Sequence, residues 1–380
     1  MTTTTIAKFA HLQIPLEDVL KATDNFHFHK IIRHGGLGLT YRGVLLHSGN
    51  WIEIAAERLD SKHGQGDDEF WTEVSMLSDL KHPNIVSIVG FCDEEDEKII
   101  VTRYAANESL QELLDFNPGL LTWSQRLKIC VGVARALSYL YYDKSRDYSV
   151  IHGNIKSSTI LLDENLKPKL SGFKVPIKQS ANRVEQVIHS KPVGTTGYMD
   201  PEIEKNKGVT HKSDIFSFGV VLFEILCGML AFNSHDGNRL LARWAIDHYE
   251  NGKLHDIIHP YIRNQMSQLS LVVYSKTAYS CLKQMQTERP PHIIDIVDEL
   301  ERALTLQLRH ENRVRLFFIF NIACHFCFFL RLLLSIPLLY LLISLILKYI
   351  SLRTKTLITN NTTFNIQLTN LFLFTTLLEN

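Results

Sequence analysis

The sequence has no excess of either charge. Its 40 lysines and arginines balance 40 aspartates and glutamates over 380 residues, which gives no electrostatic reason to expect nucleic acid as a partner. Cysteine is also scarce. The six cysteines are scattered and mostly lie in apolar runs, a pattern typical of buried thiols in a reducing compartment. Cys324 and Cys327 have a C-x-x-C spacing, but no second pair is present to complete a metal site. We therefore expect neither a metal nor a nucleic acid.

A secretory signal is missing as well. Residues 1–10 contain no long apolar core and no cleavage-site pattern. Residues 1–25 form a lead-in segment, in which apolar side chains such as Leu16 and Val19 fit one face of a short helix. We expect this helix to end at the turn signal of Asp24.

The most informative stretch is residues 150–174. Its motif positions are occupied, in order, by His152, Gly153, Asn154, Thr159, Gly172, Phe173 and Lys174. The order and spacing resemble the catalytic loop and metal-binding segment of a protein kinase, H-R-D-x-x-x-x-N followed by D-F-G. The resemblance implies an α+β, two-lobed protein-kinase fold, with a small β-rich N-lobe that carries one regulatory helix and a larger helical C-lobe.

The resemblance covers residues 26–305. It is greatest to the plant receptor-like (Pelle-related) kinases, judged by short matches at residues 89–92, 155–158 and 217–221. The expected organisation is a lead-in segment at 1–25, an N-lobe at about 26–104, a C-lobe at about 105–305 and a hydrophobic tail at 306–380.

The resemblance also implies a nucleotide cleft beneath a glycine-rich turn. Glycine lets backbone amides approach phosphates with no side chain in the way. The residues implied to line this vestigial cleft are Gly35, Gly36, Gly38, Thr40, Ala55, Thr102 and Tyr104. Arg33 replaces the first glycine of the family pattern, and a plain β-hairpin is the alternative interpretation of the turn taken alone.

Residues 52–60 align with the strand whose lysine binds the phosphates, but the lysine is replaced by Glu57. The following helix keeps Glu73, the usual partner of that lysine. Two carboxylates about 4 Å apart repel by about 4 kcal/mol at an effective dielectric of about 20. The sequence leaves several outcomes open: the helix moves away, one acid is protonated, Arg58 or another cation intervenes, or Glu57 points to solvent.

The catalytic positions carry no acid. In active relatives the loop aspartate accepts the substrate proton, while the asparagine and the D-F-G aspartate bind magnesium. Asn154 is a neutral amide, Thr159 offers only a hydroxyl, and Gly172 has no side chain. Magnesium prefers carboxylate oxygen. Lys156 is retained, yet we expect no intact catalytic residue, no metal and no required cofactor.

By contrast, the residues that organise the fold are kept. The resemblance implies that His152 and Phe173 stack in a spine between the lobes, and that Asp214 lies in the buried central helix. It also implies that Arg289 pairs with Glu202 inside the C-lobe. Because an unpaired buried charge is costly, retention of both partners indicates that the lobe folds.

These features favour a pseudokinase, a signalling scaffold or allosteric partner of other protein kinases or receptors. The alternative is an atypical ATP-dependent serine/threonine kinase that uses an unrecognised base and metal site. A third interpretation is that ATP binds without magnesium as a conformational ligand.

The tail changes composition abruptly. Residues 316–347 are mostly Leu, Phe and Ile, and acids are absent until Glu379. Residues 327–347 are long enough for a transmembrane helix, which would place a cytoplasmic kinase-like domain at the plasma membrane. The alternative is that the tail is translated non-coding sequence.

Overall fold

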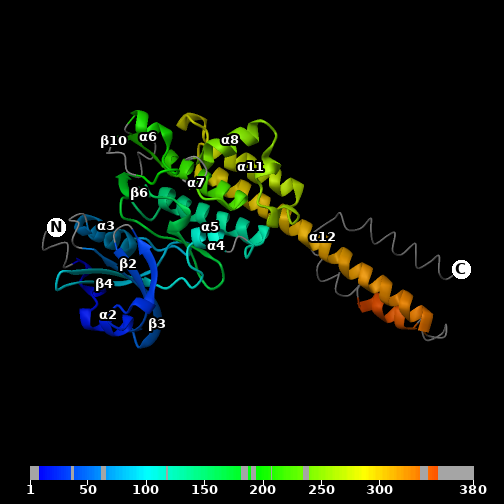
Figure 1. Ribbon diagram of the computed structural model, residues 1–380, viewed down its shortest axis with the longest axis horizontal. Coiled ribbons are helices and arrows are strands. Elements are labelled where there is room, and N and C mark those ends of the chain that lie inside the picture. The colour runs from blue at the N-terminus through cyan, green and yellow to red at the C-terminus, as the bar shows by residue number, and fades with distance from the viewer. Residues whose placement is uncertain are drawn as a thin grey trace. The chain divides into compact units, whose positions relative to one another are not determined.

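The computed structural model describes residues 8–35, 38–60, 66–116, 119–180, 187–189, 194–206, 208–233, 239–333 and 341–349. The chain divides into two compact units, Met1–Arg309 and His310–Asn380. The first unit contains the two lobes and every residue of the candidate site (Figure 1).

The N-lobe is built on a five-stranded antiparallel sheet in the order β1-β2-β3-β5-β4. The strands are β1 (Ile31–Gly35), β2 (Gly38–His47), β3 (Asn50–Leu59), β4 (Ile88–Glu94) and β5 (Glu97–Arg103). Successive side chains of a strand point to opposite faces of the sheet, so the apolar run in β5 places apolar side chains on both faces. Ile100 packs in the core that includes α3 (Gly66–Asp79), whereas Val101 packs in the cluster that includes α2 (Leu16–Thr23). The two helices therefore cover opposite faces of the sheet (Figure 1).

Helix α2 confirms the expected lead-in helix. Leu16 and Val19 are buried, and Asp24 ends the helix in a left-handed conformation with φ of 54°. Two short 3-10 turns, η1 (Ala10–Leu12) and η2 (Phe28–Lys30), flank it.

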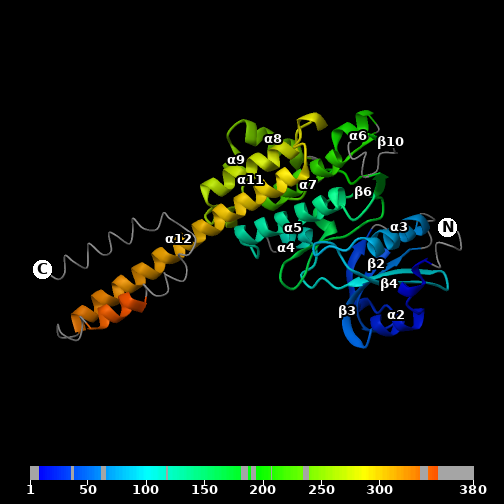
Figure 2. The same ribbon diagram turned by 180° about the vertical axis from the view of Figure 1, so that it is seen from behind.

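The C-lobe is helical. Its helices are α4 (Leu110–Phe116), α5 (Trp123–Tyr142), α6 (Pro201–Asn206), α7 (His211–Cys227), α8 (Leu241–Glu250), α9 (Leu254–Ile257), α10 (Pro260–Arg263), α11 (Gln268–Cys281) and α12 (Ile293–Leu333), with 3-10 turns η4 (Ser157–Thr159) and η7 (Gln286–Glu288). Helix α7 is apolar on nearly every side, as a helix in the middle of a core must be. It contacts α5, α8 and α11, which lie around it in Figure 2.

Two short antiparallel pairs position the catalytic loop. Strand β6 (Tyr148–Ile151) pairs with β9 (Ile177–Ser180), and β7 (Ile160–Leu162) pairs with β8 (Pro168–Leu170). The loop after β6 and the segment between β8 and β9 therefore lie next to each other. Two-residue strands β10 (Ile188–His189) with β11 (Gly208–Val209), and β12 (Phe232–Asn233) with β13 (Arg239–Leu240), complete the C-lobe. The sheet-based N-lobe and helical C-lobe confirm the predicted two-lobed kinase fold.

The tail departs from expectation. Among the residues that the structure describes, no helix is both long enough and apolar enough to cross a bilayer. This finding goes against the transmembrane helix predicted at 327–347, of which 334–340 lie outside the described residues.

Candidate functional site

The catalytic loop is fixed by Asp214 from α7. The Asp214 carboxylate accepts hydrogen bonds from the backbone N–H groups of His152 at 2.6 Å and Gly153 at 2.9 Å, and from the Tyr141 hydroxyl at 3.1 Å. Burial raises the pKa of Asp214 to about 6, although these donors act in the opposite direction. The loop backbone is therefore held in place by a buried side chain of α7.

His152 and Phe173 form the predicted stack. Their rings meet edge to face with centroids 4.6 Å apart. The His152 Nδ1 accepts the backbone N–H of Asn154 at 3.2 Å, so Nε2 carries the proton and donates to the Ser171 carbonyl at 3.1 Å. Burial lowers the pKa of His152 to about 4, which keeps the ring neutral at physiological pH.

The fold brings Asn154, Thr159 and Gly172 together. A Cβ atom on Gly172 would lie 2.9 Å from Thr159 Cγ2 and 3.6 Å from Asn154 Nδ2. The Thr159 hydroxyl lies within the loop, 3.1 Å from the Asn154 carbonyl and 2.9 Å from the Lys156 carbonyl. These three residues offer an amide, an engaged hydroxyl and no carboxylate, a donor set that does not fit magnesium. Nowhere in the described ranges do three His, Cys, Asp or Glu side chains gather as a metal site would require.

Glu57 is paired with a cation that the sequence did not single out. Its carboxylate forms an ion pair with the ammonium of Lys174, the residue after Phe173. The two side chains are 26% and 18% exposed, so neither points freely to solvent. Arg58 instead pairs with Glu97, with Nε and Oε2 2.7 Å apart. Of the outcomes that the sequence left open, the structure contains the one in which another cation intervenes.

Glu73 completes this charged group. Its Oε1 accepts the backbone N–H of Phe173 at 3.0 Å, and its buried Oε2 has no partner among the described residues. Burial raises the pKa of Glu73 to about 7, and the negative charge of Glu57 acts in the same direction, while Lys174 opposes both. The raised pKa favours the protonated form of Glu73 more than in an ordinary glutamate, which is the direction of the outcome in which one acid is protonated.

The Glu57 carboxylate lies below the glycine-rich turn. A Cβ atom on Gly35 would be 3.9 Å from Glu57 Oε1, and Thr40 faces Glu57 across the β2 and β3 pair. Gly38 adopts φ of 154°, and a Cβ atom there would lie 2.0 Å from the Arg58 carbonyl oxygen, so no other residue fits. Gly36, the remaining predicted glycine, lies outside the described residues.

The backbone at the end of β5 forms hydrogen bonds within the N-lobe. The Tyr104 N–H donates to the Glu53 carbonyl at 3.2 Å, and the Arg103 N–H donates to the Ser87 carbonyl at 3.0 Å. Ala55 faces Thr102 in the β3 and β5 pair. The Arg103 and Tyr104 amides are thus already hydrogen-bonded within the protein.

Lys156 is directed at the segment before α6. Its ammonium lies 3.1 Å from the Thr195 hydroxyl. Burial lowers the pKa of Lys156, and the positive charge of Lys174 acts in the same direction. Lys156 and Lys174 are thus close enough for the charge of one to act on the other.

The ion pair inside the C-lobe differs from the prediction. Arg289 forms two hydrogen bonds of 2.7 Å with Asp200, and both side chains are fully buried. Glu202 instead accepts the backbone N–H of Gln286 at 3.3 Å. Asp200 precedes Pro201, the first residue of α6, and also accepts the Glu202 N–H at 3.0 Å. Its short side chain therefore points inward, whereas Glu202 belongs to the first turn of the helix.

A buried acid that the sequence did not predict joins the loop to α7. Glu224 Oε1 accepts hydrogen bonds from the Tyr198 hydroxyl at 2.6 Å, the Ser157 hydroxyl at 3.2 Å and the Ala231 N–H at 3.0 Å. Burial raises the pKa of Glu224 to about 7. The only sequence signal was a charged residue inside the apolar run of α7.

Comparison with known proteins identifies this arrangement. Residues 26–299 match the family described as protein tyrosine and serine/threonine kinase. From Arabidopsis thaliana, the receptor-like protein kinase HERK 1 is 38% identical over 311 residues, which are 80% of this chain and 36% of that protein. THESEUS 1 is 37% identical over 297 residues, 77% of this chain and 34% of that protein, and FERONIA is 37% identical over 295 residues, 76% and 32% respectively.

This chain thus spans about a third of the length of these curated relatives. The family match covers both lobes, including the glycine-rich turn, the catalytic loop and α7. The chain therefore belongs to the protein tyrosine and serine/threonine kinase family, and its relatives are plant receptor-like kinases.

Proposed function

We propose that this protein is a catalytically inactive kinase-fold signalling protein, a scaffold or allosteric partner of active kinases or receptors. One observation carries the proposal. The place where an active kinase needs a phosphate-binding cation holds the Glu57 carboxylate, which is neutralised by Lys174. A carboxylate there repels nucleotide phosphates, and the cation beside it is already paired.

The loss of the catalytic base supports the same proposal. Asn154 cannot accept the proton of a substrate hydroxyl, and loss of a general base typically slows a reaction by about 10²–10⁴. Thr159 and Gly172 provide no carboxylate for magnesium, and loss of the metal removes several further kcal/mol of charge stabilisation. These effects act on one transition state and do not simply add, yet each lies in the direction of inactivity.

The fold around the site is nevertheless stabilised by buried hydrogen bonds and an ion pair. Asp214 fixes the catalytic loop, Glu73 binds the Phe173 amide, and Arg289 pairs with Asp200. A protein that keeps the kinase fold but lacks the catalytic residues is suited to binding other proteins. Since its relatives are receptor-like kinases, we propose that the partners are receptors or their kinases, at the cytoplasmic face of the plasma membrane.

A role for ATP without magnesium is a second candidate. Lys156 is a cation beside the loop, with its ammonium 3.1 Å from the Thr195 hydroxyl. It would offset part of the charge of a nucleotide that is bound without a metal, and such a ligand would act on conformation rather than as a phosphate donor.

Thermal unfolding with ATP, in the presence and absence of Mg²⁺, tests both candidates. We expect no magnesium-dependent rise of Tm, because the metal ligands are missing. A rise with ATP alone, lost on Lys156→Met, supports nucleotide as a conformational ligand. A rise that requires Mg²⁺ and is accompanied by autophosphorylation would refute the proposal and favour the atypical serine/threonine kinase.

A further inference from the structure

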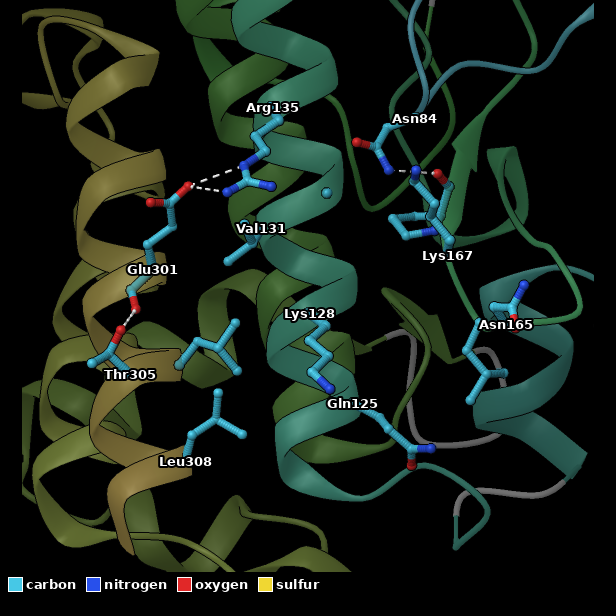
Figure 3. Close-up of a pocket in the computed structure, with 14 residues that line it drawn as sticks. Asn84, Gln125, Lys128, Val131, Arg135, Asn165, Lys167, Glu301, Thr305 and Leu308 are labelled. Atoms are coloured by element: carbon cyan, nitrogen blue, oxygen red, sulfur yellow. Dashed lines mark hydrogen bonds and ion pairs between the residues drawn. The ribbon is translucent and has the colours of Figure 1, made fainter. Parts of the chain in front are cut away.

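A cavity of about 530 Å³ opens on the C-lobe, between α5, α12 and the turn that joins β7 to β8 (Figure 3). The residues that line it are Asn84, Gln125, Lys128, Val131, Gly132, Arg135, Asn165, Leu166, Lys167, Pro168, Glu301, Leu304, Thr305 and Leu308. None of them belongs to the nucleotide cleft or the catalytic loop. The cavity therefore needs its own explanation.

The floor of the cavity is apolar. Leu304 and Leu308 are four residues apart on α12, so they lie on one helix face, and both are half-buried. Val131 on α5 and Leu166 in the turn also line the cavity with apolar side chains. Such a recess suits an apolar side chain of another molecule.

The rim of the cavity is positive. Lys128 on α5 and Lys167 in the turn between β7 and β8 are exposed, and a third cation, Arg135, is paired with Glu301 at 2.7 Å (Figure 3). The lining therefore carries three bases and one acid, although the whole chain is neutral. Burial lowers the pKa of nearby His82, and the charges of Lys167 and Arg135 act in the same direction.

The turn beside the cavity is fixed by hydrogen bonds. Asp163 Oδ1 accepts the backbone N–H groups of Asn165 at 3.0 Å and Lys167 at 2.9 Å, while Asn84 Nδ2 donates to the Pro168 carbonyl at 3.0 Å. On the other side, a Cβ atom at Gly132 would lie 2.4 Å from Pro168 Cγ, so α5 and the turn are in close contact. A preformed recess loses little entropy when it binds.

We propose that this cavity is a docking groove for an acidic segment of a partner protein with a Leu, Ile or Phe anchor. The anchor enters the apolar floor, and carboxylates that flank it pair with Lys128 and Lys167. A membrane surface fits less well, because the apolar side chains line a recess instead of projecting from it. The inference rests on the proposed function, since a scaffold needs a binding surface outside its cleft.

Selection from random short peptides tests the groove directly, because the method requires no partner of defined sequence. Phage-displayed peptides are selected on the full chain, and their affinity is measured by fluorescence anisotropy. Lys128→Gln with Lys167→Gln removes the rim charge, and Thr305→Trp fills the recess from an exposed position. Lys253→Gln with Lys276→Gln makes the same charge change at exposed sites outside the groove. Unchanged Tm shows that each variant is folded.

We expect selected peptides rich in Asp and Glu around an apolar residue. Their affinity should fall about fivefold or more in both groove variants and stay unchanged in the control. Absence of acidic binders, or binding that is indifferent to the groove variants, would overturn the inference. So would binding of phosphatidylserine vesicles through the same lysines without peptide binding. Kinase activity in the same preparation would refute the proposed function and leave the peptide result unaffected, so the two failures are distinguishable.

Discussion

Replacement of Lys174 by methionine tests the ion pair that joins β3 to the segment after Phe173. The change leaves Glu57 without its cation and next to the buried Glu73. Loss of one partner of a fully buried pair costs about 3–5 kcal/mol, whereas exposed pairs contribute about 0–1 kcal/mol. With side chains 26% and 18% exposed, this pair lies between those limits, and we expect Lys174→Met to lower the free energy of unfolding by about 1–3 kcal/mol.

Urea unfolding of a double-mutant cycle measures this effect. Glu57→Gln alone leaves Lys174 without its partner, but Glu57→Gln with Lys174→Met removes both charges and should recover most of the loss. Lys276→Met, on the exposed face of α11, is the control for loss of a lysine. A loss below about 0.5 kcal/mol for Lys174→Met, or additive effects in the cycle, would show that the pair does not stabilise the fold.

Two further predictions concern buried acids. Asp200→Asn leaves the buried Arg289 charge unpaired and should cost about 3–5 kcal/mol in urea unfolding, whereas Glu202→Gln should cost less than about 1 kcal/mol; equal losses would contradict the assigned pairing. The pKa of Glu73 is raised from 4.5 to about 7 in the folded state, so the stability it contributes is fully present below pH 4.5 and is lost as the pH rises through 7. The Tm of Glu73→Gln relative to that of wild type should therefore rise as the pH increases from 4.5 to 7. A difference in Tm between the two proteins that does not change with pH would contradict the raised pKa.

The fold could be predicted from the sequence because each kinase motif is a short stretch of neighbouring residues and the motifs follow one another in the expected order. The glycine-rich turn, the loop around His152 and the apolar run of α7 each have a recognisable pattern, and their succession along the chain matches one architecture. The carboxylate of Asp214 could be placed for the same reason. The absence of acids at positions 154 and 172, which are occupied by Asn154 and Gly172, was likewise evident from the sequence.

The partners of the charged residues could not be predicted in this way. Glu57 and Lys174 are far apart in the chain, and only the approach of β3 to the segment after Phe173 brings them together. The choice of Asp200 over Glu202 by Arg289 depends on which side chain points inward at the start of α6. Sequence spacing does not contain this information.

Transfer of radiolabelled phosphate from ATP to a generic acceptor protein, with Mg²⁺ present, tests the central claim most directly. A variant with Glu57→Lys, Asn154→Asp, Thr159→Asn and Gly172→Asp, purified in the same way, provides the matched comparison. We predict no incorporation by the wild-type protein above that of a Thr102→Trp variant, in which the cleft is blocked. Incorporation by wild type that disappears in the blocked variant would contradict the account.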